Sequence, residues 1–112
     1  MTGAMDILSR LEQTIAERSS GNPDVSYVAK LNARGLPVMA RKLGEEATET
    51  LIAALTGDQE ELTGEAADLL FHLLVLLDAK DVPFANVLHE LARREGLSGL
   101  EEKAARADKG DA

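Results

Sequence analysis

Apolar residues recur every three to four positions along most of the chain, and turn-forming residues divide this pattern into five segments. Such a period is typical of helices that each bury one face. The segments predict helices over about residues 6–18, 27–34, 37–56, 59–79 and 83–95. The pattern therefore predicts an all-α fold of four to five helices.

Capping residues support these boundaries. Ser26 is a candidate N-cap for the second helix, and Gly35 closes that helix in a left-handed conformation. Pro37 suits the first turn of the third helix. Asp58 followed by Glu61 forms a capping box for the fourth. The short turn before Asp58 lets the third and fourth helices fold back antiparallel.

The third and fourth helices differ in their apolar pattern. In the third helix, the acidic residues are expected on a face separate from the apolar, buried face. The predicted buried face comprises Met39, Ala40, Leu43, Ala47, Leu51 and Ala54. The fourth is apolar almost all round from Leu69 onward, and such a helix must be surrounded. We therefore expect an antiparallel helical bundle completed by dimerisation, with residues 73–77 buried between subunits of a homodimer or a dimer of dimers.

Composition narrows the class of protein. The 112 residues suit a single domain, in which residues 1–5 form a flexible leader and about 107–112 a flexible tail. There is no cysteine, and aromatic residues are 3% of the chain, which favours helices over a sheet. A net charge of −8 disfavours nucleic acid and anionic membranes as partners. No signal peptide or membrane span is visible, so we expect a cytoplasmic protein.

Two acidic clusters lie in consecutive predicted helices: Glu45, Glu46 and Glu49 in the third, Glu65 and Asp68 in the fourth. Helical residues three or four positions apart share a face, so four or five carboxylates would converge across one seam. Like charges at this spacing destabilise a helix unless a counter-charge binds. An all-oxygen set of ligands favours Mg²⁺.

Positive charge lies close to these clusters in sequence. Lys42 precedes Glu46 by about one turn and is placed to meet a phosphate, while Lys30, Arg34 and Arg41 add further cations. Bound Mg²⁺ would bridge the carboxylates to a polyphosphate and polarise its phosphoryl group. The pattern therefore indicates a Mg²⁺ site that binds a polyphosphate.

Two single residues are less informative. Tyr27, the only tyrosine, lies next to a loop, where it either lines a nucleotide pocket or simply packs. His72 follows Asp68 by one helical turn, and we expect a hydrogen-bonded histidine in the interior or at an interface.

Two other classes of protein compete with this interpretation. A di-iron bundle requires Glu-x-x-His pairs, but Asp68 stands three residues after Glu65, and no histidine lies near Glu49. A non-catalytic acidic dimerisation module is the other alternative, but it does not explain why the carboxylates converge. A rise in melting temperature with Mg²⁺ would favour the metal site over this module.

The acidic motif and its surroundings resemble a known family. Glu46-x-x-Glu49, fifteen intervening residues and Glu65-x-x-Asp68 are similar to the metal motif of the MazG-type all-α nucleoside triphosphate pyrophosphatases. Within that superfamily, the chain most closely resembles the phosphoribosyl-ATP pyrophosphatase family of histidine biosynthesis, from about Ile7 to Arg106. The matching segments are residues 26–35, 42–49, 57–58, 65–74, 87–91 and 98–103.

The resemblance implies Mg²⁺-dependent hydrolysis of phosphoribosyl-ATP to phosphoribosyl-AMP and pyrophosphate, without an organic cofactor. It implies a role for Glu45 as a further ligand or as the base that orients water. Thr48 and Thr50 stand where the family often has small apolar residues, a departure expected to leave the site unaffected. The implied metal ligands are Glu46, Glu49, Glu65 and Asp68.

The substrate is where this superfamily divides. A house-cleaning (deoxy)nucleoside triphosphate pyrophosphatase would use the same metal site and the same attack on the α-phosphorus. Phosphoribosyl-ATP carries an additional 5′-phosphate, which a guanidinium binds in a bidentate manner. Arg34 or Arg106 would therefore suit this phosphate better than Lys30 or Lys103.

Overall fold

The computed structural model describes residues 4–96, 99, 103, 104 and 106, and within them the chain forms five α-helices and no strand. This confirms the predicted all-α fold. The first helix begins two residues before its predicted start at Asp6. Most of the predicted flexible leader (residues 1–3), the predicted flexible tail (107–112) and most of the family-like segment 98–103 lie outside the described residues. The helices are α1 (Ala4–Arg18), α2 (Tyr27–Arg34), α3 (Leu36–Thr56), α4 (Gln59–Ala79) and α5 (Phe84–Arg94).

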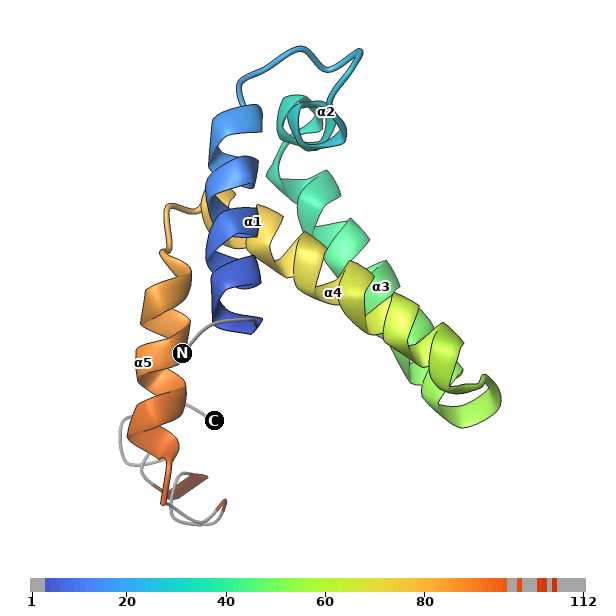
Figure 1. Cartoon of the computed structure of the whole chain (residues 1–112), viewed down its shortest axis with the longest axis vertical. Helices are drawn as coiled ribbons and strands as arrows, with labels where there is room; N and C mark the ends of the chain where they lie inside the picture. The colour runs from blue at the N-terminus through green and yellow to red at the C-terminus, as the bar shows by residue number, and fades with distance from the viewer. Residues whose placement is uncertain (1–3, 97–98, 100–102, 105, 107–112) are drawn as a thin grey trace. The chain divides into compact units, whose positions relative to one another are not determined.

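The helices belong to two compact units, α1 to α4 in residues 1–82 and α5 in residues 83–112. In the first unit α3 and α4 lie side by side, α1 packs against α4, and α2 packs against α3 (Figure 1). The most deeply buried large side chains are Ile15, Leu31 and Leu74, which come from three of these helices. No helix in the described part of the chain has both the length and the apolar character to cross a membrane.

The predicted caps are confirmed at both ends of α2. The Ser26 hydroxyl accepts a hydrogen bond from the Ala29 amide at 3.1 Å. The Gly35 amide donates to the Leu31 carbonyl, and Gly35 has φ = +99°, a conformation that favours glycine. Because α3 begins at the next residue, Gly35 ends one helix and begins the other.

The turn between α3 and α4 has the N-cap half of the predicted capping box. The Gly57 amide donates to the Ala53 carbonyl, which closes α3. The Asp58 carboxylate accepts a hydrogen bond from the Glu61 amide at 2.9 Å, which satisfies one free donor at the start of α4. This short connection is what places the two acidic helices next to each other.

The prediction for the buried face of α3 is largely wrong. Met39 and Ala53 are buried, and Glu46 and Thr50 are half-buried along the line between them. Positions 39, 46, 50 and 53 share one face of a helix, about a quarter turn from the predicted face. Of the predicted face only Met39 is buried, and Leu43 is half-buried. The other four residues are exposed, Leu51 at 60% and also Ala40, Ala47 and Ala54. The acidic cluster therefore lies at the helix–helix seam and not apart from it.

The residues of α4 predicted to be buried between subunits also differ from that prediction. Leu74 and Val75, expected between subunits, are already buried within the single chain. Residues 73, 76 and 77 are half-buried. The large apolar side chains that remain exposed on the α3–α4 hairpin include Leu51, Ile52, Leu55 and Leu70 instead.

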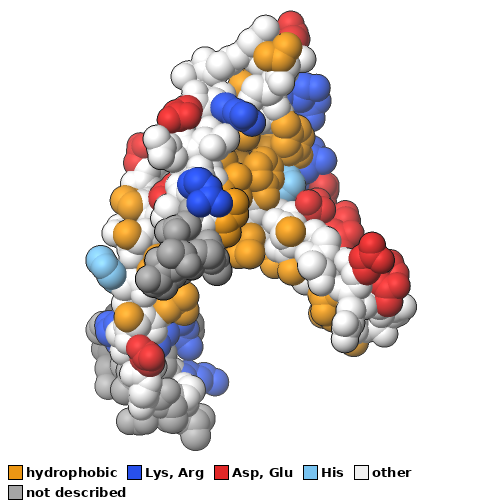
Figure 2. Space-filling view, viewed as in Figure 1, with side chains coloured by type: hydrophobic (Ala, Val, Ile, Leu, Met, Phe, Trp, Pro, Cys, Tyr) orange, Lys and Arg blue, Asp and Glu red, His pale blue; other side chains and the backbone are white. Residues whose placement is uncertain are grey.

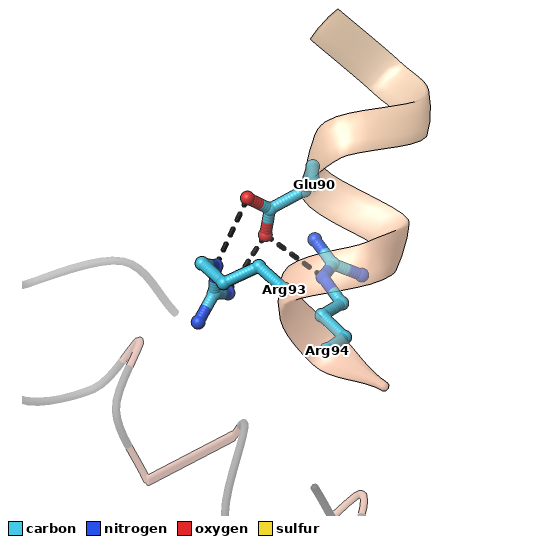
Figure 3. Close-up of polar contacts among 3 residues, drawn as sticks. All are labelled: Glu90, Arg93 and Arg94. Atoms are coloured by element: carbon cyan, nitrogen blue, oxygen red, sulfur yellow. Dashed lines mark hydrogen bonds and ion pairs between the residues drawn. The ribbon is translucent and has the colours of Figure 1, made fainter. Parts of the chain in front are cut away.

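In the second unit, α5 carries an ion-pair cluster (Figure 3). Both Glu90 oxygens accept hydrogen bonds from Arg93, at 3.0 and 2.7 Å, and Arg94 Nε donates to one of them at 2.9 Å. Arg93 first, then Arg94, lower the pKa of Glu90 to about 2. The three side chains are partly exposed, where ion pairs contribute little to stability.

Candidate metal centre

Three of the four predicted metal ligands converge between α3 and α4. Glu46 and Glu49 come from α3 and Glu65 from α4, and one carboxylate oxygen of each lies within 4.8 Å of the others. Figure 2 shows acidic side chains gathered along the α3–α4 hairpin. Three oxygens at this separation can share one divalent cation as ligands.

Two of these carboxylates carry an oxygen that is buried without a partner. Oε2 of Glu46 and Oε1 of Glu65 have no hydrogen-bond partner among the described residues. Leaving an anionic oxygen buried and unpaired is costly, so native proteins pair such groups with hydrogen-bond donors or metals. Burial, followed by the adjacent carboxylates of Glu49 and Glu46, raises the pKa of Glu65. The donor set thus fits a hard cation that would satisfy both buried oxygens.

The raised pKa of Glu65 predicts how pH affects the metal-free protein. The folded state holds this proton more tightly than the unfolded chain, so its stabilising effect is complete below the ordinary value of 4.5 and is lost as pH rises through the folded-state pKa. Glu65→Gln should therefore raise the melting temperature in EDTA at pH 7, and the gain over the parent should shrink toward pH 4.5. Thermal unfolding followed by circular dichroism measures this. A gain that grows on acidification would contradict it.

Asp68, the fourth predicted ligand, is exposed and its carboxylate is not part of this group. It follows Glu65 by three residues, so the two side chains leave α4 on neighbouring turns. The backbone of Asp68 is fixed, since its carbonyl accepts a hydrogen bond from Nδ1 of His72 at 2.9 Å.

Glu45 lies outside the group of three carboxylates. Its oxygens form ion pairs with Lys42 Nζ at 3.5 Å and Arg41 Nε at 3.6 Å. With Gly44, Thr48 and Glu49, the residues Arg41 and Glu45 line an open cavity of about 500 Å³ on α3. Since Glu49 belongs to both the cavity and the carboxylate group, these cations lie beside the candidate metal centre.

The two cations predicted on α2 are less closely tied to the carboxylates. Lys30 and Arg34 are both exposed and lie one turn apart on the helix that packs against α3. The described contacts join neither of them to the acidic group.

Tyr27 and His72 form a hydrogen-bonded pair at one end of the seam. The Tyr27 hydroxyl lies 3.1 Å from His72 Nε2, and His72 Nδ1 binds the Asp68 carbonyl. Because a carbonyl only accepts, Nδ1 carries a proton, and in the neutral imidazole Nε2 accepts from the tyrosine. His72 is 7% exposed, which confirms the predicted hydrogen-bonded interior histidine.

Thr50 contacts the backbone of two predicted ligands, although no sequence pattern indicated this. Its hydroxyl donates to the Glu46 carbonyl at 2.7 Å and lies 3.2 Å from the Glu65 carbonyl on the facing helix. It therefore connects the backbones of two predicted ligands, so this departure from the family lies beside the site that it was expected to leave unaffected. Thr48 instead binds the Gly44 carbonyl on its own helix.

Comparison with known proteins decides the family. The profile described as phosphoribosyl-ATP pyrophosphohydrolase matches residues 8–95, most of the chain. The chain belongs to this family. The resemblance inferred from the acidic motif and its flanking segments is thereby confirmed.

Relatives of this family match at high identity over nearly their whole length. A protein of Novosphingobium aromaticivorans is 70% identical over 103 residues, which are 92% of this chain and 96% of the relative. A protein of Erythrobacter litoralis is 68% identical over 93% of this chain and 100% of the relative. A protein of Rhizobium johnstonii is 56% identical over 88% of this chain and 92% of the relative. All three bear the name phosphoribosyl-ATP pyrophosphatase.

Proposed function

We propose that this chain is a hydrolase that converts phosphoribosyl-ATP to phosphoribosyl-AMP and pyrophosphate, a step of histidine biosynthesis. Family membership supports the substrate, since its relatives bear that enzyme's name. The observation that supports the chemistry is the group of three carboxylates with two buried, unpaired oxygens. The same family membership favours a cytoplasmic location, which cell fractionation would test.

Mg²⁺ is the cation that we propose for this site. Glu46, Glu49 and Glu65 would hold it, with Asp68 as the fourth ligand from the next turn of α4. When bound, Mg²⁺ supplies charge neutralisation on the polyphosphate and polarisation of the phosphoryl group. Carboxylate ligands are the chemistry that this ion prefers.

The protein groups around the site have complementary tasks in the proposed reaction. Water attacks the α-phosphorus, the bond from this phosphorus to the bridging oxygen of the β-phosphate breaks, and pyrophosphate leaves with that oxygen. Glu45 would accept a hydrogen bond from the water and orient it. Lys42, which pairs with Glu45, would bind a phosphate oxygen beside it. Positioning and charge compensation are the main contributions a protein makes to phosphoryl transfer.

The substrate itself can be tested with a panel of phosphoribosyl-ATP, ATP and deoxynucleoside triphosphates, following pyrophosphate release. We expect a strong preference for phosphoribosyl-ATP. Arg34→Ala should lower kcat/KM for it by about ten- to a hundredfold, the effect of one charged hydrogen bond, and should leave the slower hydrolysis of ATP unchanged.

The matched control is Arg10→Ala, which removes an exposed arginine from α1. It should behave like the parent protein. Comparable turnover of a deoxynucleoside triphosphate would replace the proposed substrate by that of a house-cleaning pyrophosphatase.

We further propose that the active form is a homodimer. Leu51, Ile52 and Leu55 on α3 and Leu70 on α4 are 43–77% exposed. Large apolar side chains gathered on neighbouring helices are typical of a surface that another protein covers. A second copy of α3–α4 would complete the helical bundle that the sequence predicts.

A further inference from the structure

A second cavity lies in the same compact unit as the carboxylate group. It encloses about 500 Å³, within the roughly 300–1,000 Å³ typical of small-molecule sites. Its walls come from the end of α1, the connection to α2, the start of α2 and the middle of α4. The lining residues are Arg18, Val25, Ser26, Tyr27, Val28 and Phe71.

Aromatic rings are concentrated in this cavity. The chain has one tyrosine, two phenylalanines and no tryptophan, and Tyr27 and Phe71 both line the cavity. Their rings are nearly parallel, with centroids 6.0 Å apart and an angle of 21° between the planes. Tyr27 is 48% exposed and Val25 83%, so apolar surface stays open to solvent at this point. A planar ring bound here would cover that surface and stack on an aromatic face.

Contacts with His72 fix the orientation of the Tyr27 ring. Its hydroxyl donates to Nε2 of the buried His72, and the His72 ring makes edge contacts with both Tyr27 and Phe71. A side chain held in this way loses little conformational freedom when a ligand binds.

The cavity shares α4 with the candidate metal centre, since Phe71 and Glu65 both belong to this helix. Phe71 follows Glu65 by six residues and the proposed ligand Asp68 by three, a rise of about 9 Å and about 4.5 Å along α4. His72 Nδ1 binds the Asp68 carbonyl, so the wall of the cavity is connected to the backbone of a proposed ligand. A nucleotide whose phosphates meet the carboxylates through a cation would extend its base in this direction.

We propose that the cavity between Arg18, residues 25–28 and Phe71 binds the purine ring of the nucleotide substrate, stacked against Tyr27 and Phe71. This inference rests on the proposed function, because that function places a polyphosphate at the carboxylates. The aromatic pair is a specificity element that distinguishes a nucleotide from a simpler organic phosphate.

Tyr27 provides a direct measurement, because it is the only tyrosine and there is no tryptophan. The intrinsic tyrosine fluorescence of the full chain therefore reports on this cavity alone. Titration with AMP in EDTA should quench it in a saturable way, whereas ribose 5-phosphate should not. Unchanged fluorescence at saturating AMP, or equal quenching by both ligands, would overturn the proposal.

Calorimetric titration of variants tests the stacking itself. Phe71→Leu should weaken AMP binding by about five- to a hundredfold, the typical effect of losing one base–aromatic stack, and should raise KM more than it lowers kcat. Tyr27→Phe keeps the ring but loses the hydrogen bond to His72, so it should bind AMP more weakly than the parent and more tightly than Tyr27→Leu. Ile7→Ala is the control, because it removes an exposed apolar side chain from the first turn of α1, whose other end lines the cavity, and it should leave AMP binding unchanged.

These outcomes are distinct from a failure of the proposed function. If the chain binds AMP with quenching of Tyr27 but does not hydrolyse phosphoribosyl-ATP, the base site stands and the assigned reaction is wrong. If it hydrolyses phosphoribosyl-ATP and Phe71→Leu changes neither KM nor AMP binding, the base site is wrong.

Discussion

Replacing Glu46 by Gln should lower Mg²⁺-dependent release of pyrophosphate by more than about a hundredfold while the helical fold remains. Removal of an outer partner of a metal ligand typically costs 10–100-fold, and loss of a ligand itself should cost more. Glu46 is a proposed ligand in the α3–α4 seam and, with Glu65, one of two that carry a buried oxygen without a partner among the described residues. Its loss therefore removes charge from the place where a cation is most needed.

The same substitution should stabilise the metal-free protein, because the carboxylate of Glu46 contributes to the raised pKa of Glu65. Mg²⁺ should raise the melting temperature of the parent and have little effect on the variant. The matched control is Glu60→Gln in the first turn of α4, which changes an exposed glutamate outside the group of three. Full activity in purified Glu46→Gln would refute the metal centre.

Replacing Leu51 by Glu should dissociate the homodimer without unfolding the chain. Leu51 is 60% exposed in the single chain, so the substitution disturbs no packing within it. Burial of one leucine contributes about 1.5–3 kcal/mol, and a twofold interface contains each position twice. The dissociation constant should therefore increase by about 10²–10⁴-fold.

Sedimentation velocity at micromolar concentration measures this change, and circular dichroism confirms that the helices remain. Leu74→Glu cannot serve the purpose, because Leu74 is 2% exposed within the chain and a charge there would disrupt the core. The control is Ile7→Glu, which places the same charge on an exposed apolar position of α1. A parent protein that sediments as a folded monomer would contradict the proposed dimer, as would dissociation by Ile7→Glu alone.

Local features of the sequence determined the helices and their ends. The caps at Ser26, Gly35 and Asp58 depend on hydrogen bonds within a few residues and on the backbone preference of glycine. The acidic spacing within each helix likewise follows from its pitch. The short turn between α3 and α4 then requires the two acidic segments to meet. These interactions are close in sequence, which is why they could be predicted.

Only the tertiary structure decided which face of each helix is covered. A helical period defines faces but not the neighbour that covers one of them, and α3 carries apolar residues on two sides. The packing of α4 placed Glu46 in the seam and left Leu51 exposed, because the helix–helix contact follows the line from Met39 to Ala53.

The surroundings of the site depended on the same long-range packing. Thr50 reaches the Glu65 carbonyl, and Tyr27 reaches His72, only because helices distant in sequence lie side by side. The sequence by itself therefore determined the helices, their caps, the carboxylates and the family. The packing of α1 to α4 against one another decided the buried face of α3, the hydroxyl between the predicted ligands and the aromatic cavity, since these depend on contacts that no local pattern encodes.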